Sequence, residues 1–386
     1  MLNCKEFFDL LHENKIDFFS GVPDSLLKFF NSYILDNVDQ NQHIITANEG
    51  NAIALASGYY LATTKIGLVY MQNSGLGNAI NPLVSLSDKE VYGIPVLLLI
   101  GWRGEPNEKD EPQHQKQGKI TLELLETLDI PYEILTKDIE DTKIKLLSAI
   151  KYMNKFNAPF ALVVKKGTFE KYEQINESQQ NYELSREKAI NLIIDNIDEQ
   201  DIVVSTTGMI SRELFESRIQ KNQRHETDFL TVGSMGHASQ IALGIAISNP
   251  KKQVFCLDGD GSVIMHMGSL GIIGSKQMKN FKHIILNNES HDSVGGQPTV
   301  GNIINFVSLA KSCKYKNSFK VLTEIELNKK MLKLKSDDGP ILLEIMVNRG
   351  NRKELGRPTK TPKENMNLFM NFLSRWSKNL YLNFSF

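Results

Sequence analysis

The chain has 386 residues, of which 41% are hydrophobic and 23% are charged, and its formal net charge is −1. This length allows two globular domains whose cores need no disulfide bonds. The near-neutral charge argues against a nucleic-acid-binding protein, which usually carries a basic surplus, and no apolar run is long enough to span a membrane. The three cysteines are scattered and the N-terminus lacks a signal-peptide pattern, so we expect a cytoplasmic protein with no membrane partner.

Two series of short apolar segments alternate with helical patterns along the chain. The runs VLLLI and FALVV are apolar on both faces, as strands of a covered parallel sheet must be. The predicted strands are 17–20, 44–47, 67–70, 95–100 and 160–164 in the first series, and 202–205, 229–232, 253–257, 283–286 and 341–347 in the second. The predicted fold class is therefore α/β, with two doubly wound parallel-sheet domains and no middle domain.

Changes in composition predict the domain boundaries. The first domain is expected at 1–168 and the second at 188–361, and the linker between them, 169–187, lacks glycine and is rich in Glu, Gln and Asn. A helical tail is expected over 362–386. The apolar residues that recur there at helical spacing are Leu368, Phe369, Phe372 and Trp376.

The strongest chemical signal lies in the second domain. A predicted strand runs into Gly259-Asp260-Gly261-Ser262, with a helix expected after Ser262, and the next strand ends in Asn287-Asn288. Parallel strands end at the same edge of a sheet, so Asp260 and Asn288 can converge. A carboxylate and an amide oxygen suit Mg²⁺ or Ca²⁺, and Mg²⁺ commonly shares its shell with phosphate groups. The glycines and the helix N-terminus also favour a phosphate. The pattern predicts a diphosphate held through a metal ion.

The glycine motif has three other possible interpretations. An EF-hand loop fails because its sixth position is Val263 and its twelfth is Ser269, and a P-loop would need a terminal Gly-Lys-Ser/Thr. A plain glycine turn explains this motif alone, but not its pairing with Asn287-Asn288 after the next strand. Zinc is not expected, because no two histidines have zinc-ligand spacing.

The two motifs together resemble the signature of thiamine-diphosphate enzymes. The resemblance implies that Mg²⁺ is bound by Asp260, Asn288 and the main-chain carbonyl of Ser290. It implies that Met235 supports the bent cofactor, although core packing is the commoner role of a methionine. After Asn288 this chain has Glu289, where relatives often have glycine, which leaves the geometry of the metal contact open. The residues assigned to the cofactor in this way are Gly208, Ser234, Met235, Gly259, Asp260, Gly261, Ser262 and Asn288, with Glu49 from the first domain.

Glu49 follows a predicted strand and opens a helix of small residues. On its own, an acid in a first helical turn is favoured by the helix dipole, which leaves a purely structural role open. The resemblance implies instead that Glu49 shares a proton with the aminopyrimidine ring of thiamine diphosphate. It also implies that Glu49 of one chain faces Asp260 of another, so a homodimer or higher homo-oligomer is expected.

Further motifs resemble the phosphonopyruvate decarboxylases, with the sulfopyruvate decarboxylases as the nearest relatives. They occur in the expected order along nearly the whole chain, at 21–25, 71–78, 101–106, 110–118, 293–299 and 355–358. The resemblance implies a 2-oxo acid carboxy-lyase that converts 3-phosphonopyruvate to phosphonoacetaldehyde and CO₂ in phosphonate biosynthesis. A sulfopyruvate decarboxylase, and a cofactor-binding protein without catalysis, are the alternatives.

An anionic 2-oxo acid substrate needs cationic or N–H-rich partners. Arg103, His114 and Lys116 supply such groups and are expected in one loop after the fourth predicted strand, although solvated loop charges would give the same pattern. Asp24 is expected either to relay protons or to cap a helix. The predicted substrate-binding residues are Ser25, Asn73, Arg103, His114 and Lys116, and the predicted catalytic residues are Glu49, Asp24 and His114.

Overall fold

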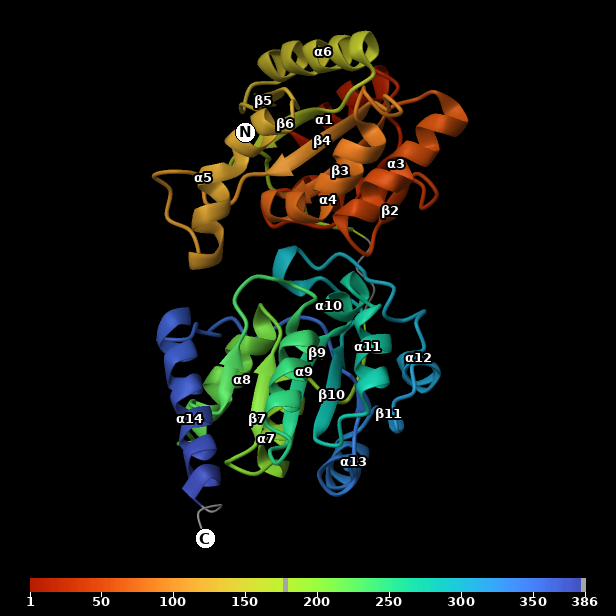
Figure 1. Ribbon diagram of the computed structural model, residues 1–386. Helices are drawn as coiled ribbons and strands as arrows, with labels where there is room; N and C mark the ends of the chain where they lie inside the picture. The colour runs from red at the N-terminus through yellow and green to blue at the C-terminus, as the bar shows by residue number, and fades with distance from the viewer. Residues whose placement is uncertain (176–179, 383–386) are drawn as a thin grey trace. The chain divides into compact units, whose positions relative to one another are not determined.

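The computed structural model describes residues 1–175 and 180–382, with side chains described up to residue 374. The chain forms two compact units, Met1–Ser178 with Ser293–Pro298, and Gln179–Asp292 with Thr299–Phe386. Each unit contains one six-stranded sheet in which every pair of neighbouring strands is parallel. In Figure 1 the ribbons of each unit show helices on both sides of its sheet.

The first sheet has a buried central strand and helices on both faces. Its strands, in spatial order, are β2 (His43–Ile45), β1 (Phe19–Gly21), β3 (Gly67–Gln72), β4 (Val96–Gly101), β6 (Phe160–Val164) and β5 (Tyr132–Ile134). One face is covered by α1 (Cys4–Glu13), α2 (Lys28–Asn37) and α6 (Ile139–Phe156), and the other by α3 (Glu49–Thr63), α4 (Leu76–Pro82) and α5 (Pro112–Thr127). Every residue of β4 is buried, because both faces of this strand lie under helices.

The second sheet repeats this plan. Its strands, in spatial order, are β11 (Asn317–Val321), β12 (Ile341–Met346), β10 (Phe281–Asn287), β9 (Val254–Gly259), β7 (Ile202–Ser205) and β8 (Asp228–Leu230). One face packs on α7 (Arg186–Asn196), α8 (Met209–Gln220) and α13 (Glu324–Ser336). The remaining helices of the sandwich are α9 (Ala238–Ser248), α10 (Asp260–Met265), α11 (Ser269–Lys276) and α12 (Phe306–Ser312). Short helical turns are η1 (Asn73–Gly75), η2 (Leu83–Ser87) and η3 (Asp292–Val294).

The C-terminal helix α14 (Pro362–Leu382) begins where the sequence predicted and packs along the edge strand β8. The rings of Phe229 and Phe369 lie 5.6 Å apart, and Asn365 Nδ2 donates to the Asp228 carbonyl at 2.9 Å. The side chain of Trp376, predicted on the same apolar stripe, lies outside the described residues. None of the helices in the described part of the chain is long and apolar enough to cross a membrane.

The predicted fold class is confirmed, and each predicted strand overlaps an observed one. The prediction missed β5 and β11 (Asn317–Val321), which are both edge strands. All residues of β5 are half-buried, and β11 carries an exposed lysine, Lys320. An edge strand covered on one side needs no continuous apolar run, so a pattern search for buried strands does not find it.

The predicted linker range, 169–187, has structured ends. Phe169 belongs to the first core and pairs with Leu2 in an isolated β-bridge, and α7 begins at Arg186. Residues 176–179, inside this range, lie outside the described part of the chain.

Candidate functional site

The Asp260 carboxylate is buried directly after the end of β9, at the edge of the second sheet. β9 continues through Gly259, and α10 begins at once with Asp260, not after Ser262 as predicted. Gly259 is the extended N-cap residue, with φ −107° and ψ 154°, so strand and helix meet without an intervening loop. The Asp260 side chain is 2% exposed and accepts a hydrogen bond from Thr299 Oγ1.

Asn288 lies next to Asp260, as predicted from their positions at the ends of two neighbouring parallel strands. The backbone N–H groups of Gly261 and Asn288 both donate toward the Asp260 carboxylate. Asn288 is 5% exposed, and its Oδ1 accepts a hydrogen bond of 3.3 Å from the Ser290 N–H. The structure therefore places Asn288 beside Asp260 and links Ser290 to Asn288 through its N–H group.

The surroundings of Asp260 fit a divalent cation. Burial raises the pKa of Asp260 to about 7, although hydrogen bonds from Thr299 and nearby N–H groups oppose the shift. Among the side chains of residues 1–175 and 180–374, no cationic group forms an ion pair with it, and the Ser290 hydroxyl is buried without a partner. A cation would neutralise the buried charge, and carboxylate and amide oxygens are the ligands that Mg²⁺ prefers.

Gly301 permits the close approach of a neighbouring loop to this carboxylate. A Cβ at residue 301 would lie 2.6 Å from Asp260 Oδ2 and 2.7 Å from Asn287 Oδ1, which is closer than side chains pack. Asn287 Nδ2 donates to the Gly301 carbonyl at 2.9 Å and to Glu344 Oε1 at 2.8 Å. Asn287 thus holds the loop at Gly301 in place, while Asn288 lies beside Asp260.

Glu289 occupies the position where the sequence departs from the expected glycine. Its φ is 55°, in the left-handed region that favours glycine. The departure therefore keeps the backbone conformation that a glycine would adopt and adds a carboxylate at that point.

The loop before α9 presents Met235 outside the core. Gly233, Ser234 and Gly236 all have positive φ, at 72°, 51° and 87°. Met235 between them is half-buried, which favours contact with a ligand over ordinary core packing. A strained loop that holds an apolar side chain out of the core is consistent with contact to a bound ligand.

One of the predicted cofactor contacts, Ser262, is hydrogen-bonded to this loop. Ser262 Oγ accepts from the Gly236 N–H at 3.1 Å and shares a hydrogen bond of 2.9 Å with Thr206 Oγ1. Gly208, at φ 96°, is the residue before α8. The Ser262 hydroxyl thus links two loops at the edge of the sheet, a role that the sequence did not indicate.

Glu49 is a buried acid in the first turn of α3. It is 5% exposed and accepts a hydrogen bond of 2.8 Å from Asn78 Nδ2, while Gly75 lies directly against its carboxylate. Burial raises the pKa of Glu49, and the Asn78 hydrogen bond opposes this shift. Asn48 already caps the helix by accepting from the Asn51 N–H. A purely helix-stabilising acid would be exposed, so the burial of Glu49 argues for a chemical role.

A polar network in the first unit centres on Asp110. Arg103 Nε donates to Asp110 Oδ2 at 2.8 Å, Arg103 Nη1 donates to Ser25 Oγ at 2.6 Å, and His114 Nδ1 lies 2.9 Å from Asp110 Oδ1. Burial would raise the pKa of Asp110, but the hydrogen bonds from Arg103 and His114 hold it well below its usual range. Asn73 Nδ2 joins the network through the Arg103 carbonyl at 2.8 Å. Sequence analysis missed Asp110, although it lies in a quoted motif between Arg103 and His114.

The expected single loop for the cationic residues is wrong. His114 and Lys116 lie in the first turns of α5, which begins at Pro112, because proline suits the first position of a helix. His114 is buried, but Lys116 is exposed and forms no ion pair in the described part of the chain. The helix thus directs His114 into the network and leaves Lys116 at the surface.

Asp24 is fully buried beside this network. Its carboxylate accepts from Gln72 Nε2 at 2.7 Å and from the Leu26 N–H at 2.9 Å, and burial raises its pKa. The N-cap residue of α2 is Leu27, but the Asp24 carboxylate also caps the turn that leads into this helix, through the Leu26 N–H, so both predicted roles remain open. A buried carboxyl with a raised pKa is suited to holding and passing a proton.

A separate buried group comprises Cys256, Asp258 and His283, whose possible ligand atoms lie within 4.8 Å of one another. Cys256 and His283 are directly paired across β9 and β10. His283 Nε2 lies 3.4 Å from Asp258 Oδ2, and Asp258 Oδ1 accepts from the Gly259 N–H at 3.0 Å. Burial raises the pKa of the Cys256 thiol, which disfavours a metal-binding thiolate. The contacts of this group position the end of β9.

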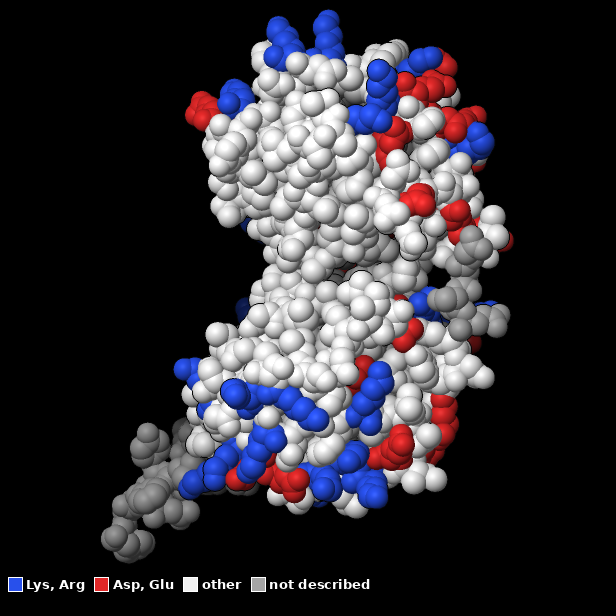
Figure 2. Space-filling model, turned by 90° about the vertical axis from the view of Figure 1, so that its right-hand side faces the viewer, with Lys and Arg blue, Asp and Glu red and all other residues white. Residues whose placement is uncertain are grey.

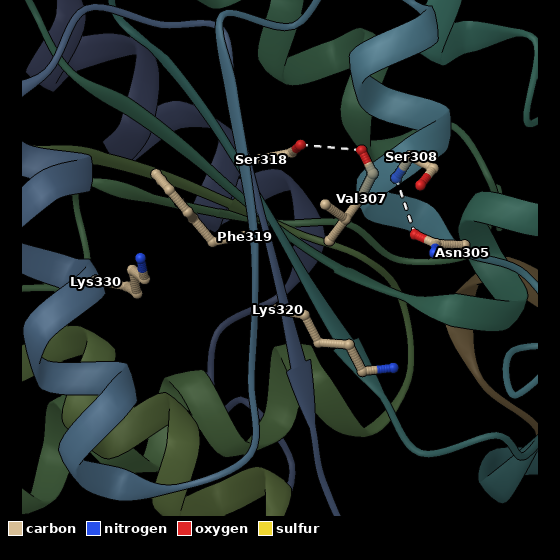
Figure 3. A pocket seen from close by; sticks show the side chains of 7 residues that line it. All are labelled: Asn305, Val307, Ser308, Ser318, Phe319, Lys320 and Lys330. Atoms are coloured by element: carbon tan, nitrogen blue, oxygen red, sulfur yellow. Dashed lines mark hydrogen bonds between the residues drawn. The ribbon is translucent and has the colours of Figure 1, made fainter.

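The pocket in Figure 3, of about 410 Å³, lies apart from the predicted site residues. Its lining comprises Asn305, Val307, Ser308, Ser318, Phe319, Lys320 and Lys330. Lys320 Nζ lies 3.2 Å from Glu344 Oε1, the atom that also accepts from Asn287 Nδ2. The buried Glu344 therefore contacts both a residue that lines the pocket, Lys320, and Asn287 near the Asp260 site.

Comparisons with known proteins bear on both units. The family model described as "Thiamine pyrophosphate enzyme, N-terminal TPP binding domain" matches residues 5–124. The model described as "Thiamine pyrophosphate enzyme, C-terminal TPP binding domain" matches residues 206–345. The first match contains Glu49, and the second contains Asp260 and Asn288.

Curated relatives match along nearly the whole chain. Phosphonopyruvate decarboxylase of Streptomyces viridochromogenes is 31% identical over 372 residues, covering 92% of this chain and 91% of the relative. Phosphonopyruvate decarboxylase of Streptomyces hygroscopicus is 30% identical, covering 92% and 89%. Sulfopyruvate decarboxylase of Methanosarcina acetivorans is 28% identical, covering 82% and 84%.

Proposed function

We propose that this chain, which belongs to the thiamine-diphosphate-dependent 2-oxo acid decarboxylases, converts 3-phosphonopyruvate to phosphonoacetaldehyde and CO₂. Mg²⁺ is its proposed metal. The chain is a carbon–carbon lyase with two thiamine-diphosphate-binding domains. We further propose that it acts in the cytoplasm, in phosphonate biosynthesis.

The observation that carries the proposal is the buried Asp260 carboxylate beside Asn288. Its raised pKa and its lack of a cationic partner in the described part of the chain support a bound Mg²⁺. Asp260, Asn288 and the Ser290 carbonyl would hold the ion, which bridges to the diphosphate. Thiamine diphosphate supplies the electron sink for loss of CO₂. The residues of the chain supply binding, orientation and proton transfer.

Glu49 would share a proton with the aminopyrimidine ring of the cofactor. Its burial and its raised pKa support this role, because the surroundings make the ionised form of the carboxyl less favourable. Asn78 and Gly75 fix the carboxylate in one orientation. Asp24 and His114 are our candidates for proton transfer to and from the reacting acid.

The anionic end of the substrate would be bound by the network around Arg103. Ser25, Asn73 and His114 contact Arg103 or its partner Asp110. Asp110 neutralises part of the positive charge and fixes the guanidinium plane, so the network offers oriented donors. Lys116, at the surface, would attract the anion and contact it on entry.

The surface supports a homodimer or a higher homo-oligomer with sites shared between chains. In Figure 2 each unit has a broad area without charged side chains. Helix α9 has no charged residue and exposes Gly244 and Ile247, and α3 carries only one charge, Glu49, and exposes Gly58 and Leu61. Helices that are apolar on their exposed side are typical of interfaces.

The test is a direct assay of the full-length protein with thiamine diphosphate and Mg²⁺. Phosphonopyruvate should be consumed with equal amounts of CO₂ and phosphonoacetaldehyde formed. The Glu49→Gln variant serves as the control for contaminating activity and should form neither product. Consumption of sulfopyruvate but not of phosphonopyruvate would favour the alternative substrate, and consumption of neither would reject the proposal.

A further inference from the structure

The segment that follows residue 179 is fixed to the end of β12. The Tyr182 N–H donates to Asn348 Oδ1 at 2.8 Å, and Asn348 Nδ2 donates back to the Tyr182 carbonyl at 2.6 Å. The Asn348 N–H also donates to the Leu184 carbonyl at 2.9 Å. Because Val347 N–H donates to the Asn287 carbonyl at 3.0 Å, this segment, β12 and the end of β10 form one hydrogen-bonded series.

Two side chains of this segment donate hydrogen bonds to the Glu289 carboxylate. Gln180 Nε2 donates to Glu289 Oε2 at 2.6 Å and to the Asn288 carbonyl at 3.0 Å. The Tyr182 hydroxyl donates to the other carboxylate oxygen, Glu289 Oε1, at 2.7 Å. Burial raises the pKa of Tyr182 to about 12, and the Glu289 carboxylate adds to this shift, so the phenol remains a donor.

The backbone of Glu289 is held as completely as its side chain. Its N–H donates to Asn287 Oδ1 at 3.1 Å, and its carbonyl accepts from the Thr299 N–H at 3.0 Å and from Arg349 Nη2 at 3.2 Å. The residue is left-handed, with φ 55°, a conformation that a non-glycine residue keeps only when its surroundings impose it. Each polar group of Glu289 thus has a partner.

We propose that Gln180 and Tyr182, which we call the strap, are positioning residues that hold the metal loop Asn288–Ser290 in the conformation that binds the divalent cation. The inference rests on the proposed function for the identity of the cation. The strap residues donate hydrogen bonds to Glu289, which lies between Asn288 and Ser290 in the sequence. They therefore restrain the backbone that carries both proposed ligands. This segment, which lies inside the predicted linker range 169–187, therefore helps to position the metal site.

The experiment compares the full-length parent with Gln180→Ala, Tyr182→Phe and the double variant. Mg²⁺ is titrated by calorimetry in the presence of saturating thiamine diphosphate, and amide hydrogen exchange of residues 288–292 is measured without cofactor. Loss of residues that orient metal ligands costs about 10–100-fold in affinity, and we expect a loss of this size in the double variant. Exchange at 288–292 should become faster while exchange in β9 stays the same. Excess Mg²⁺ should restore the decarboxylation rate.

Two comparisons keep the test specific. Tyr92→Phe, at a residue that is 71% exposed, should leave both measurements unchanged. Glu289→Gly relaxes the left-handed backbone but removes the contacts to the strap, and Glu289→Ala removes the same contacts without that relaxation. Both should weaken Mg²⁺ binding, Glu289→Ala more strongly.

Unchanged Mg²⁺ affinity and unchanged exchange in the strap variants would overturn the inference, as would parent-like binding by Glu289→Gly. The exchange measurement needs no cofactor and no substrate, so it reports on the strap whichever acid the enzyme decarboxylates. Failure of the parent to consume phosphonopyruvate would count against the proposed function alone.

Discussion

Asn78 donates a hydrogen bond of 2.8 Å from Nδ2 to Oε2 of Glu49, on a carboxylate against which Gly75 also packs. The hydrogen bond stabilises the ionised form of Glu49, yet burial outweighs it and raises the pKa. The protein therefore keeps an oriented carboxyl group whose ionisation is opposed by its surroundings. Such a group is stable in the protonated form and can share its proton with a bound ring nitrogen.

The first prediction concerns the stability of Glu49→Gln. A carboxyl with a raised pKa binds more protons in the folded than in the unfolded state, so the stability of the parent falls as pH rises from the ordinary carboxyl range toward the folded pKa. Glutamine is neutral at every pH. The variant should therefore be as stable as the parent near pH 4 and more stable at pH 7 to 8, in thermal unfolding without cofactor. A variant that is less stable than the parent at neutral pH would contradict this account of Glu49.

The second prediction is that Asp260→Ala abolishes retention of the cofactor. The substitution removes the charged ligand of the proposed metal ion, so the diphosphate loses its bridge to the protein. Calorimetry with Mg²⁺ and thiamine diphosphate should show no binding, a larger effect than the roughly 10–100-fold loss caused by removing residues that only orient metal ligands. Parent-like binding by this variant would show that Asp260 does not hold the metal.

Glycine substitutions give the third prediction. Alanine at Gly301 would bring a Cβ to 2.6 Å from Asp260 Oδ2, so the loop or the carboxylate must move. Alanine at Gly268 meets nothing within 4 Å and is the matched control. Gly301→Ala should weaken Mg²⁺ binding about tenfold, in line with other changes next to metal ligands, while Gly268→Ala should not. Equal affinities for the two variants would mean that the site tolerates displacement at this loop.

The sequence predicted the parts of the site that depend on local patterns. Asp260 and Asn288 follow two buried strands, and strands of that kind are recognisable from apolar runs. Glu49 could be assigned only through a resemblance, because an acid in a first helical turn has a common structural explanation.

Contacts between distant parts of the chain could not be predicted. Thr299 donates a hydrogen bond to Asp260, and Gln180 donates one to Glu289. The residues of each pair lie far apart in the sequence, so no local pattern indicates the contact. Nothing in the local sequence marks Asp110 as the centre of the network that it forms with Arg103 and His114. The start of α10 at Asp260 was also missed, since a glycine motif normally indicates a turn.

The fourth prediction concerns sites shared between chains. If Glu49 of one chain faces Asp260 of another, a mixture of inactive Glu49→Gln and Asp260→Ala chains contains some sites with both residues intact. Decarboxylase activity should therefore reappear after the two variants are mixed under conditions in which subunit exchange is demonstrated. Mixing that exchanges subunits without restoring activity would place both residues of a site on the same chain.

The fifth prediction concerns the role of Arg103. In Arg103→Ala, the donors proposed to face the substrate anion are lost, and the pKa of Asp110 rises because the partner that lowers it most is gone. The KM for phosphonopyruvate should rise strongly, while the poor rate with pyruvate should hardly change. Lys116→Ala, at an exposed site, should cause a smaller rise that disappears at high ionic strength, because screening weakens exposed charges. A uniform loss on both substrates would assign Arg103 a structural role.

The most direct test of the account is the kcat/KM of the full-length enzyme for phosphonopyruvate, sulfopyruvate and pyruvate, measured side by side with thiamine diphosphate and Mg²⁺. A polar site left without its anion rejects an apolar analogue strongly, so phosphonopyruvate should exceed pyruvate by on the order of 10³-fold or more. Sulfopyruvate has a similar shape and one charge fewer, so its disadvantage should be smaller. Equal efficiency on pyruvate and phosphonopyruvate, or a higher value for sulfopyruvate, would contradict the proposed substrate.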